Sequence, residues 1–343
     1  MTARERALME AKFEIITSEA SYLKSLNLLR THYMNHPVFR DQNVVSSRDR
    51  KSLFAHIVPV HECSEKLLSE LESCWQDNIM LIGLSKRIYA IAEKHFHVYV
   101  GFCEHQGRMD RTLKRLRDAK GLFAQNLELL ESSPACCGLT LHSFLMLPMQ
   151  RITRLPLLID AVFSKCHHND DEYENWKMCL AIMNKIVTQC NEAANKSEQA
   201  FEIERISRQL EFNPTVIRPL AIAPAGILAP GTKPRYLVKK GELTHLIWRG
   251  DDAKLTFGKK FTKTTIFAFL FSDLLVLTKR KAEEQFSVFD YCPRNMLTIT
   301  SGDTLPQLPT KDLNSQTSKN LILMTLLENH ERKTIELVSI TTQ

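Results

Sequence analysis

The sequence predicts an all-α, elongated helical bundle over residues 4–212, followed by a small antiparallel β domain over residues 235–343. Two observations support this prediction. Apolar side chains recur at three- and four-residue spacing almost throughout the first 212 residues, as in amphipathic helices. The composition then changes at Asn213–Pro214, and residues 214–234 hold five prolines together with Gly226 and Gly231. Because proline and glycine interrupt regular structure, we expect a linker over residues 213–234.

The first predicted helix carries apolar side chains in two stripes. One stripe comprises Phe13, Ile16, Ala20 and Leu23, and the other Ile15, Tyr22, Leu26, Leu29 and Tyr33. Its opposite edge is polar and comprises Glu14, Ser18, Ser21 and Ser25. Breaks in the helical pattern are expected near His36–Pro37, near Gly107 and around residues 132–134.

A further helix is predicted from Thr140 to Ser164, and it contains the apolar run Leu145–Ile159. This run includes two interior prolines, Pro148 and Pro156, each of which costs a helix about 3 kcal/mol. Two such costs in one helix indicate that the exact path and bend of this helix are important to the protein.

The last predicted helix is the longest, because no glycine or proline interrupts residues 172–213. Its apolar side chains keep a seven-residue rhythm that begins at Trp176. Its polar edge comprises Asn184, Thr188, Asn191, Asn195 and Glu198. We expect one continuous helix that reaches into the next domain.

Beyond the linker the pattern is typical of strands. Arg235–Gly241 leads into Glu242–Trp248 with a strand-like pattern, and Thr264–Leu270 and Leu274–Lys279 flank a turn at Phe271–Asp273. Asn320–Leu327 and Thr334–Ile340 flank a second turn signal. Paired strands with short turns predict an antiparallel sheet.

Charge and cysteine content exclude several classes of function. The net charge of +6 and pI of about 8.8 are too mildly basic for a nucleic-acid binder, but they suit an anionic membrane surface or an acidic partner. Nine cysteines, an odd number, lie mostly in apolar stripes, and this favours reduced thiols in a cytoplasmic protein. No phosphate-binding loop or metal-ligand spacing is present, so we expect no cofactor and no metal.

Three segments together resemble the Dbl-homology domain, the exchange domain of Rho-family guanine nucleotide exchange factors. They are Lys12–Leu26 in the first helix, Leu145–Ile159, and Val187–Glu192 in the last helix. The segment Phe269–Leu277, which a basic cluster follows, is similar to strands of a pleckstrin-homology domain. The residues of the first two segments most resemble those of the ephexin subfamily.

The resemblance implies roles for particular residues. Glu14 matches the family glutamate that contacts switch I of the bound GTPase. Arg154 matches a position that is often lysine and that faces switch II. Asn191 matches an asparagine of the last helix that contacts switch II. Ser18, Gln150, Arg151 and Glu192 are expected at the same GTPase interface. The alternatives are that Glu14 and Asn191 are plain solvated positions and that Arg154 is a structural ion-pair partner.

For the second domain the resemblance implies a phosphoinositide site formed by Lys239, Lys240, Lys259 and Lys260, with a plain solvated rim as the alternative. It also implies a partial sandwich, because the chain stops after a predicted strand where the family has a closing C-terminal helix.

The expected function is acceleration of GDP release from a Rho-family GTPase, without covalent chemistry. Rho itself is the expected partner, with Rac-like and RhoG-like GTPases left open, and a phosphoinositide membrane is a further expected contact. The expected location is cytoplasmic, with a peripheral place at the plasma membrane left open. The alternative function is a non-catalytic adaptor or membrane-binding scaffold with the same fold.

Overall fold

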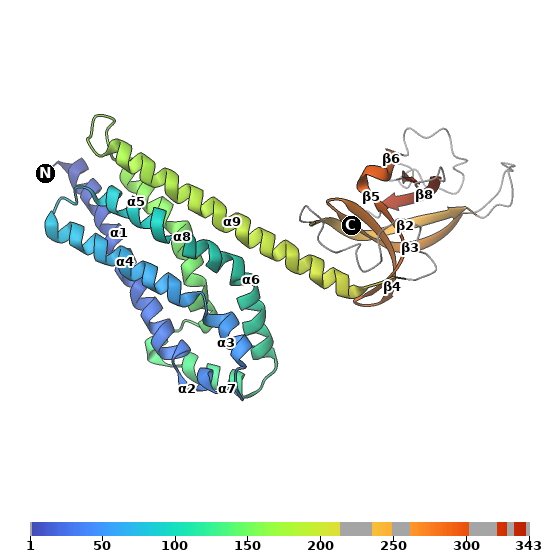
Figure 1. Ribbon diagram of the computed structural model, residues 1–343, viewed down its shortest axis with the longest axis horizontal. Coiled ribbons are helices and arrows are strands. Elements are labelled where there is room, and N and C mark those ends of the chain that lie inside the picture. Colours follow the sequence, from blue (N-terminus) through green and yellow to red (C-terminus); the bar gives the residue numbers. More distant parts are fainter. Residues whose placement is uncertain (1, 213–234, 249–260, 302–320, 328–332, 341–343) are drawn as a thin grey trace. The chain divides into compact units, whose positions relative to one another are not determined.

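The computed structural model describes residues 2–212, 235–248, 261–301, 321–327 and 333–340 (Figure 1). The chain divides into two compact units, Met1–Glu198 and Gln199–Gln343, and the boundary falls inside the long helix α9 (Tyr173–Gln209). Helices form the first unit and strands most of the second, so the predicted order of an α bundle and a β domain is confirmed.

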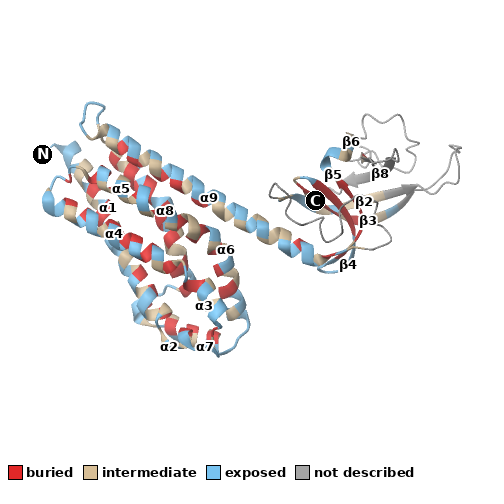
Figure 2. Cartoon of the chain, in the orientation of Figure 1, coloured by how far each residue is buried: buried red, intermediate tan, exposed pale blue. Residues whose placement is uncertain are grey.

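The described part of the first unit is helical almost throughout. Its elements before α9 are α1 (Ala3–Leu28), the π-helical turn η1 (Leu29–Met34), α2 (Pro37–Arg40), α3 (Ser47–Phe54), α4 (Ile57–Asp77), α5 (Leu84–His95), α6 (His97–Asp118), α7 (Leu122–Glu131), η2 (Pro134–Cys136) and α8 (Leu141–Phe163). The buried faces of these helices turn toward one another and enclose one continuous apolar core (Figure 2). The predicted breaks at His36–Pro37 and at residues 132–134 are confirmed.

Helix α1 begins with a capping box, in which Thr2 accepts from the backbone N–H of Glu5 and the Glu5 carboxylate accepts from that of Thr2. The stripe that contains Ile15, Tyr22 and Leu26 is the buried one. The stripe that contains Phe13 lies at the edge of the core, since Phe13 is half-buried and Ala20 is exposed.

Helix α8 confirms the range predicted from the sequence. Thr140 is its N-cap and accepts a hydrogen bond from the backbone N–H of Ser143, and Ser164 is its C-cap. Pro148 and Pro156 both lie inside the helix and both are buried. The core therefore offsets the cost of the two prolines by packing on them.

The break expected near Gly107 is wrong, because α6 continues through it to Asp118. The ion pair between Arg111 Nη1 and Glu198 Oε2, 2.7 Å long, gives the reason. A Cβ at position 107 would stand 3.0 Å from that Glu198 oxygen and 3.2 Å from Arg111 Nη1. Glycine at this position leaves room for the ion pair, which a Cβ would crowd.

The predicted long last helix is confirmed, since α9 runs without interruption for 37 residues. It ends at Gln209, however, and residues Leu210–Phe212 form a short strand, β1, that pairs in parallel with β5 (Gln285–Pro293). The expected helix as far as residue 212 is wrong in its last turn. Leu210 is buried with Phe286 in the second unit, where a strand gives it a partner.

The second unit holds one eight-stranded sheet, in the order β1-β5-β4-β3-β2-β8-β7-β6. The strands not yet given are β2 (Leu237–Trp248), β3 (Phe261–Phe271), β4 (Leu274–Ala282), β6 (Leu297–Ser301), β7 (Leu321–Leu327) and β8 (Lys333–Ile340). All pairs except β1–β5 are antiparallel, as predicted. Strands β5 and β6 are additions that the sequence pattern did not predict.

All nine cysteines are free thiols, and seven of them are buried. Burial raises the pKa of Cys63 and of Cys179 to about 12, so both stay protonated at neutral pH. These thiols pack as small apolar side chains.

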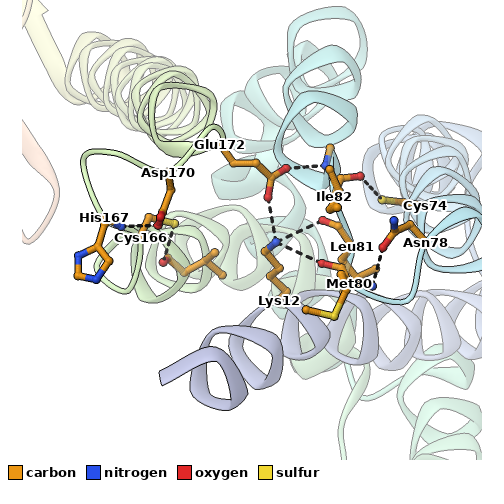
Figure 3. Close-up of polar contacts among 12 residues, drawn as sticks. Lys12, Cys74, Asn78, Met80, Leu81, Ile82, Cys166, His167, Asp170 and Glu172 are labelled. Atoms are coloured by element: carbon orange, nitrogen blue, oxygen red, sulfur yellow. Dashed lines mark hydrogen bonds and ion pairs between the residues drawn. The ribbon is translucent and has the colours of Figure 1, made fainter. Parts of the chain in front are cut away.

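A buried lysine braces the N-terminal half of α1 (Figure 3). The Lys12 ammonium lies 2.9 Å from Glu172 Oε2 and also donates to the carbonyl oxygens of Met80 and Leu81 at 3.4 Å. The other carboxylate oxygen of Glu172 accepts from the backbone N–H of Gly83 at 2.5 Å. One ion pair therefore joins α1, the α4–α5 loop and the segment that precedes α9.

We expect Glu172→Ala to lower the free energy of unfolding by about 3 kcal/mol, because it leaves the Lys12 ammonium buried without a countercharge. Urea unfolding measures the loss. Glu174→Ala is the matched control, since the Glu174 side chain is 68% exposed and, among the residues described, pairs with Lys177 alone across one helical turn. Equal stability of the two variants would contradict the role assigned to Glu172.

Candidate protein interface

A shallow groove of about 510 Å³ separates the exposed edges of α1 and α8. Its walls are mostly polar, and its lining residues are Glu14, Thr17, Ser18, Ser21, Tyr22, Ser25, Leu147, Gln150, Arg151 and Arg154. The polar edge predicted for the first helix therefore meets the helix with two prolines. Five of the seven residues predicted from the sequence for a GTPase interface lie on these two helices, and all five line the groove.

Glu14 and Arg154 face each other across this groove. Arg154 Nη2 donates to Glu14 Oε1 at 3.4 Å, and the two side chains are 60% and 54% exposed. An exposed ion pair with a single long contact contributes at most about 1 kcal/mol. Both groups are thus held near each other and remain free to exchange partners.

Beneath the exposed pair lies a buried one. Arg151 donates from Nε to Glu19 Oε2 at 2.8 Å, and its Nη2 lies 2.6 Å from the same oxygen. Its Nη1 donates to the Ser18 hydroxyl at 3.0 Å, and the Ser64 hydroxyl donates to the other Glu19 oxygen. The Glu19 and Arg151 side chains are 0% and 4% exposed, so this pair fixes α8 against α1.

Tyr22 completes this cluster. The Arg151 guanidinium lies 5.8 Å from the centre of the Tyr22 ring, and burial raises the pKa of the Tyr22 hydroxyl well above its usual value. Arg151 and Ser18 therefore hold the groove in shape, and the exposed charges in it belong to Glu14 and Arg154.

The other predicted interface residues are exposed. Gln150 lies on α8 and lines the groove, and Asn191 and Glu192 lie on α9. Within the described residues no hydrogen bond or ion pair joins Asn191 to Glu14 or Arg154. Cys190, the residue before Asn191, is buried in the core shared by the helices, so α9 is anchored immediately beside it.

Of the four lysines predicted to bind phosphoinositides, the structure describes Lys239 and Lys240. Lys239 and Lys240 are neighbours on β2, and consecutive strand residues point to opposite faces. Lys240 Nζ lies 2.7 Å from Glu202 Oε1, while Lys239 is exposed. Hydrogen bonds from Arg205 and Lys240 lower the pKa of Glu202, in keeping with this pairing. Lys259 and Lys260 lie outside the described residues.

Within the ranges that the structure describes, no three His, Cys, Asp or Glu side chains stand close enough to hold a metal ion. None of the helices described is long and apolar enough to cross a membrane. The geometry at α1 and α8 is that of an open, polar surface with two adjacent opposite charges, which suits contact with another protein.

Comparison with known families identifies the domain to which this surface belongs. The model of the RhoGEF domain matches residues 11–191, which include the first two segments singled out in the sequence and all of the third except Glu192. The chain belongs to the RhoGEF domain family. Glu14, Arg154 and Asn191 all fall inside the matched range, and Asn191 is its last residue.

Relatives and solved structures agree with this assignment. Human Rho guanine nucleotide exchange factor 26 is 35% identical over 98% of this chain and 38% of its own length. Rat Ephexin-1 is 32% identical over 95% of this chain and 42% of its own length, which confirms the resemblance to ephexins. The chain thus spans less than half the length of these relatives.

Two crystal structures share the fold of this RhoGEF chain. One is the complex of PDZ-RhoGEF DH/PH domains with GTP-gamma-S activated RhoA, with a TM-score of 0.76, 20% identity, and coverage of 100% of this chain and 91% of that one. The other, the DH/PH domains of p115-RhoGEF, has a TM-score of 0.76 at 16% identity and covers 100% and 90%. The prediction of a helical exchange domain followed by a pleckstrin-homology-like domain is therefore confirmed as a fold.

Sequence reasoning missed three charged residues that fix α1 in place: Glu19, Lys12 and Glu172. The sequence carried a signal for Lys12 and Glu19, because both interrupt the apolar side of the first helix. Lys12 lies between Ala11 and Ile15, and Glu19 lies between Ile16 and Tyr22. A charged residue on a buried helical stripe requires a buried partner. Glu172 carried no such signal, since it lies in a polar loop.

Proposed function

We propose that this RhoGEF chain accelerates GDP release from a Rho-family GTPase, with Rho itself as the preferred partner. The observation that supports this most strongly is the exposed Glu14–Arg154 pair, which the buried Glu19–Arg151 pair holds in place within the matched domain. The neighbouring structures, in which related DH/PH domains bind RhoA, support the choice of partner.

The proposed mechanism needs no covalent step. The switch loops of a small GTPase, together with Mg²⁺, hold the nucleotide, and these loops exist in more than one arrangement. A surface that binds the nucleotide-free arrangement more tightly than the loaded one shifts the equilibrium by its difference in affinity. Each tenfold difference corresponds to about 1.4 kcal/mol.

Glu14 is proposed to contact switch I. Its carboxylate is half-exposed and satisfied by one long contact, so the GTPase gains a charged acceptor without the loss of a strong internal bond. When Glu14 binds switch I, Arg154 loses its contact with Glu14, and it is proposed to face switch II. Its planar guanidinium offers more donors than the lysine found often at this position, and this difference bears on the choice of partner.

Asn191 is proposed to contact switch II from α9. The side chain is exposed, and the helix beneath it is anchored by Cys190. An amide both donates and accepts, so it can bind backbone groups of a loop that changes shape.

We expect Asn191→Ala to reduce the rate of stimulated nucleotide release about tenfold, equivalent to about 1.4 kcal/mol, with no change in the unfolding midpoint. Gln189→Ala is the matched control, because Gln189 is also an exposed amide on α9 but lines a different groove, between α9 and α5. A similar loss of rate in both variants would show that the effect is not specific to Asn191.

The proposed function is tested by release of a fluorescent GDP analogue from purified Rho, Rac and RhoG-like GTPases, each with and without this protein. We expect the largest acceleration for Rho. Capture of each GTPase in its nucleotide-free and loaded forms adds an independent readout. If no GTPase in the panel released nucleotide faster and none bound preferentially when empty, the proposal would be rejected.

We further propose the domain limits 4–212 for the exchange domain, 213–234 for the linker and 235–343 for the pleckstrin-homology-like domain. A cytoplasmic location, with a peripheral site at the plasma membrane, is proposed from the free, mostly buried thiols and the net positive charge.

A further inference from the structure

A second groove lies in the first unit, formed by η1, α2, α3 and the start of α4. Its volume is about 520 Å³, and its lining includes Arg40, Arg50 and Lys51 but no carboxylate. Its apolar lining includes the buried side chains of Val45 and Phe54 and the half-buried Val58. It shares no lining residue with the groove that contains Glu14 and Arg154.

The three cations of this groove lack acidic partners within the described structure. Arg40 donates to the side-chain oxygen of Asn35 at 3.0 Å, and Arg50 donates to the backbone carbonyl of Met34 at 3.4 Å. Lys51 is exposed and forms no ion pair with a described residue.

Several other arginines of the same unit do form ion pairs. Arg87 pairs with Glu70 and Asp77, Arg115 with Asp49, and Arg117 with Glu131. Asp49, the carboxylate of α3 itself, is thus engaged with Arg115, and it does not line the groove.

The carboxylates of Asp41 and Asp49, which are close to these cations in the sequence, therefore have other partners. Asp41 accepts from the backbone N–H of Asn43 at 2.9 Å, and it too is outside the lining. Three cations around one concavity create a positive potential that favours an anionic ligand and speeds its association.

The apolar part of the groove decides which anionic ligand fits. Phe54 packs edge-on against Phe39, with ring centres 5.5 Å apart, so the base of the groove is part of the rigid core. A concavity of this volume that combines apolar walls with a few polar groups is typical of a site for an inserted side chain. A phosphate or an inositol headgroup would use the cations and leave the apolar wall uncovered.

We propose that this basic groove docks an acidic segment of a partner protein, in which aspartate or glutamate alternates with leucine or phenylalanine. The acidic side chains bind Arg40, Arg50 and Lys51, and one apolar side chain packs against Met34, Ala55 and Val58, the accessible apolar residues of the lining. The proposal is independent of nucleotide exchange, because none of these residues belongs to the groove between α1 and α8.

The test uses fluorescence polarisation with the whole chain and three probes. One is a labelled peptide of alternating glutamate and leucine, one is a labelled peptide of glutamate alone with the same charge, and the third is phosphatidylcholine vesicles that contain phosphoinositide. We expect the first peptide to bind at least about tenfold more tightly than the second, because its leucine side chain buries apolar surface that glutamate cannot.

The matched variants reverse charge at exposed positions. Arg40→Glu combined with Lys51→Glu should weaken binding of the first peptide at least about tenfold. Lys66→Glu combined with Lys94→Glu makes the same change in net charge at exposed sites away from the groove and should leave binding unchanged.

Circular dichroism establishes that both double variants fold. Equal loss of binding in the two double variants, equal binding of the two peptides, or binding of vesicles but not of peptide would each overturn the proposal. Because the exchange assay is expected to give wild-type rates for both double variants, failure here is distinguishable from failure of the proposed function.

Discussion

Glu14→Ala is expected to reduce stimulated nucleotide release by at least about 100-fold, which corresponds to about 2.7 kcal/mol of lost differential binding. The physical reason is that Glu14 supplies the exposed carboxylate of the groove. The Glu19 carboxylate is fully buried and already satisfied by Arg151 and Ser64, so it cannot replace Glu14. Release of a fluorescent GDP analogue from Rho measures the effect.

Stability should hardly change in this variant. The Glu14–Arg154 pair is exposed at both ends, so its loss costs less than about 1 kcal/mol. Glu10→Ala is the matched control, because Glu10 is an exposed glutamate one turn earlier on α1 and does not line the groove. A Glu14→Ala protein that exchanged nucleotide at the wild-type rate would remove Glu14 from the mechanism.

The helices were predictable from the sequence because their signals are local. Thr140 and Ser164 flank an apolar run of helical period, and they are the caps that the structure shows for α8. The absence of glycine and proline over residues 172–213 likewise predicted one long helix, whose start and continuity α9 confirms, while its end at Gln209 was not predicted. Local signals failed at Gly107, where a contact with Glu198, far along the chain, decides the structure.

Strand β5 shows why part of the sheet was missed. A register shift opposite Leu277 and Thr278 leaves Phe289 between the paired residues Val288 and Asp290. This irregularity breaks the alternation by which strands are recognised. Phe286 and Val288 then belong to one apolar cluster, while Cys292 belongs to the other.

The candidate interface was predictable only in its exposed half. The family pattern points to Glu14 and Arg154, and the structure brings them within 3.4 Å. Arg151 belongs to the same sequence pattern, yet its side chain is buried, because its role depends on Glu19 from another helix. Sequence spacing alone does not distinguish a residue that faces a partner from one that faces the core. Where Asn191 stands relative to the groove residues likewise depends on packing between helices.

Glu19→Ala is expected to give the largest loss of stability in the molecule, about 3–5 kcal/mol, because it leaves the Arg151 guanidinium buried without a countercharge. The Ser64 hydroxyl also loses its acceptor. For a domain of this size each kcal/mol lowers the unfolding midpoint by about 2–4 °C, so a fall on the order of 6–20 °C is expected. Thermal and urea unfolding followed by circular dichroism measure it.

The double variant Glu19→Met with Arg151→Met separates stability from positioning. Replacement of a buried ion pair by apolar side chains of similar volume is often neutral or stabilising, so this variant should regain most of the lost stability. The nucleotide-exchange rate of this variant then reports on the positioning of Arg154 and Glu14, and not on stability. If the pair fixes α8 against α1 so that Arg154 faces Glu14, exchange stays low in a stable protein, because methionine packs without directional bonds. A double variant with both wild-type stability and wild-type exchange would show that apolar packing alone sets this geometry.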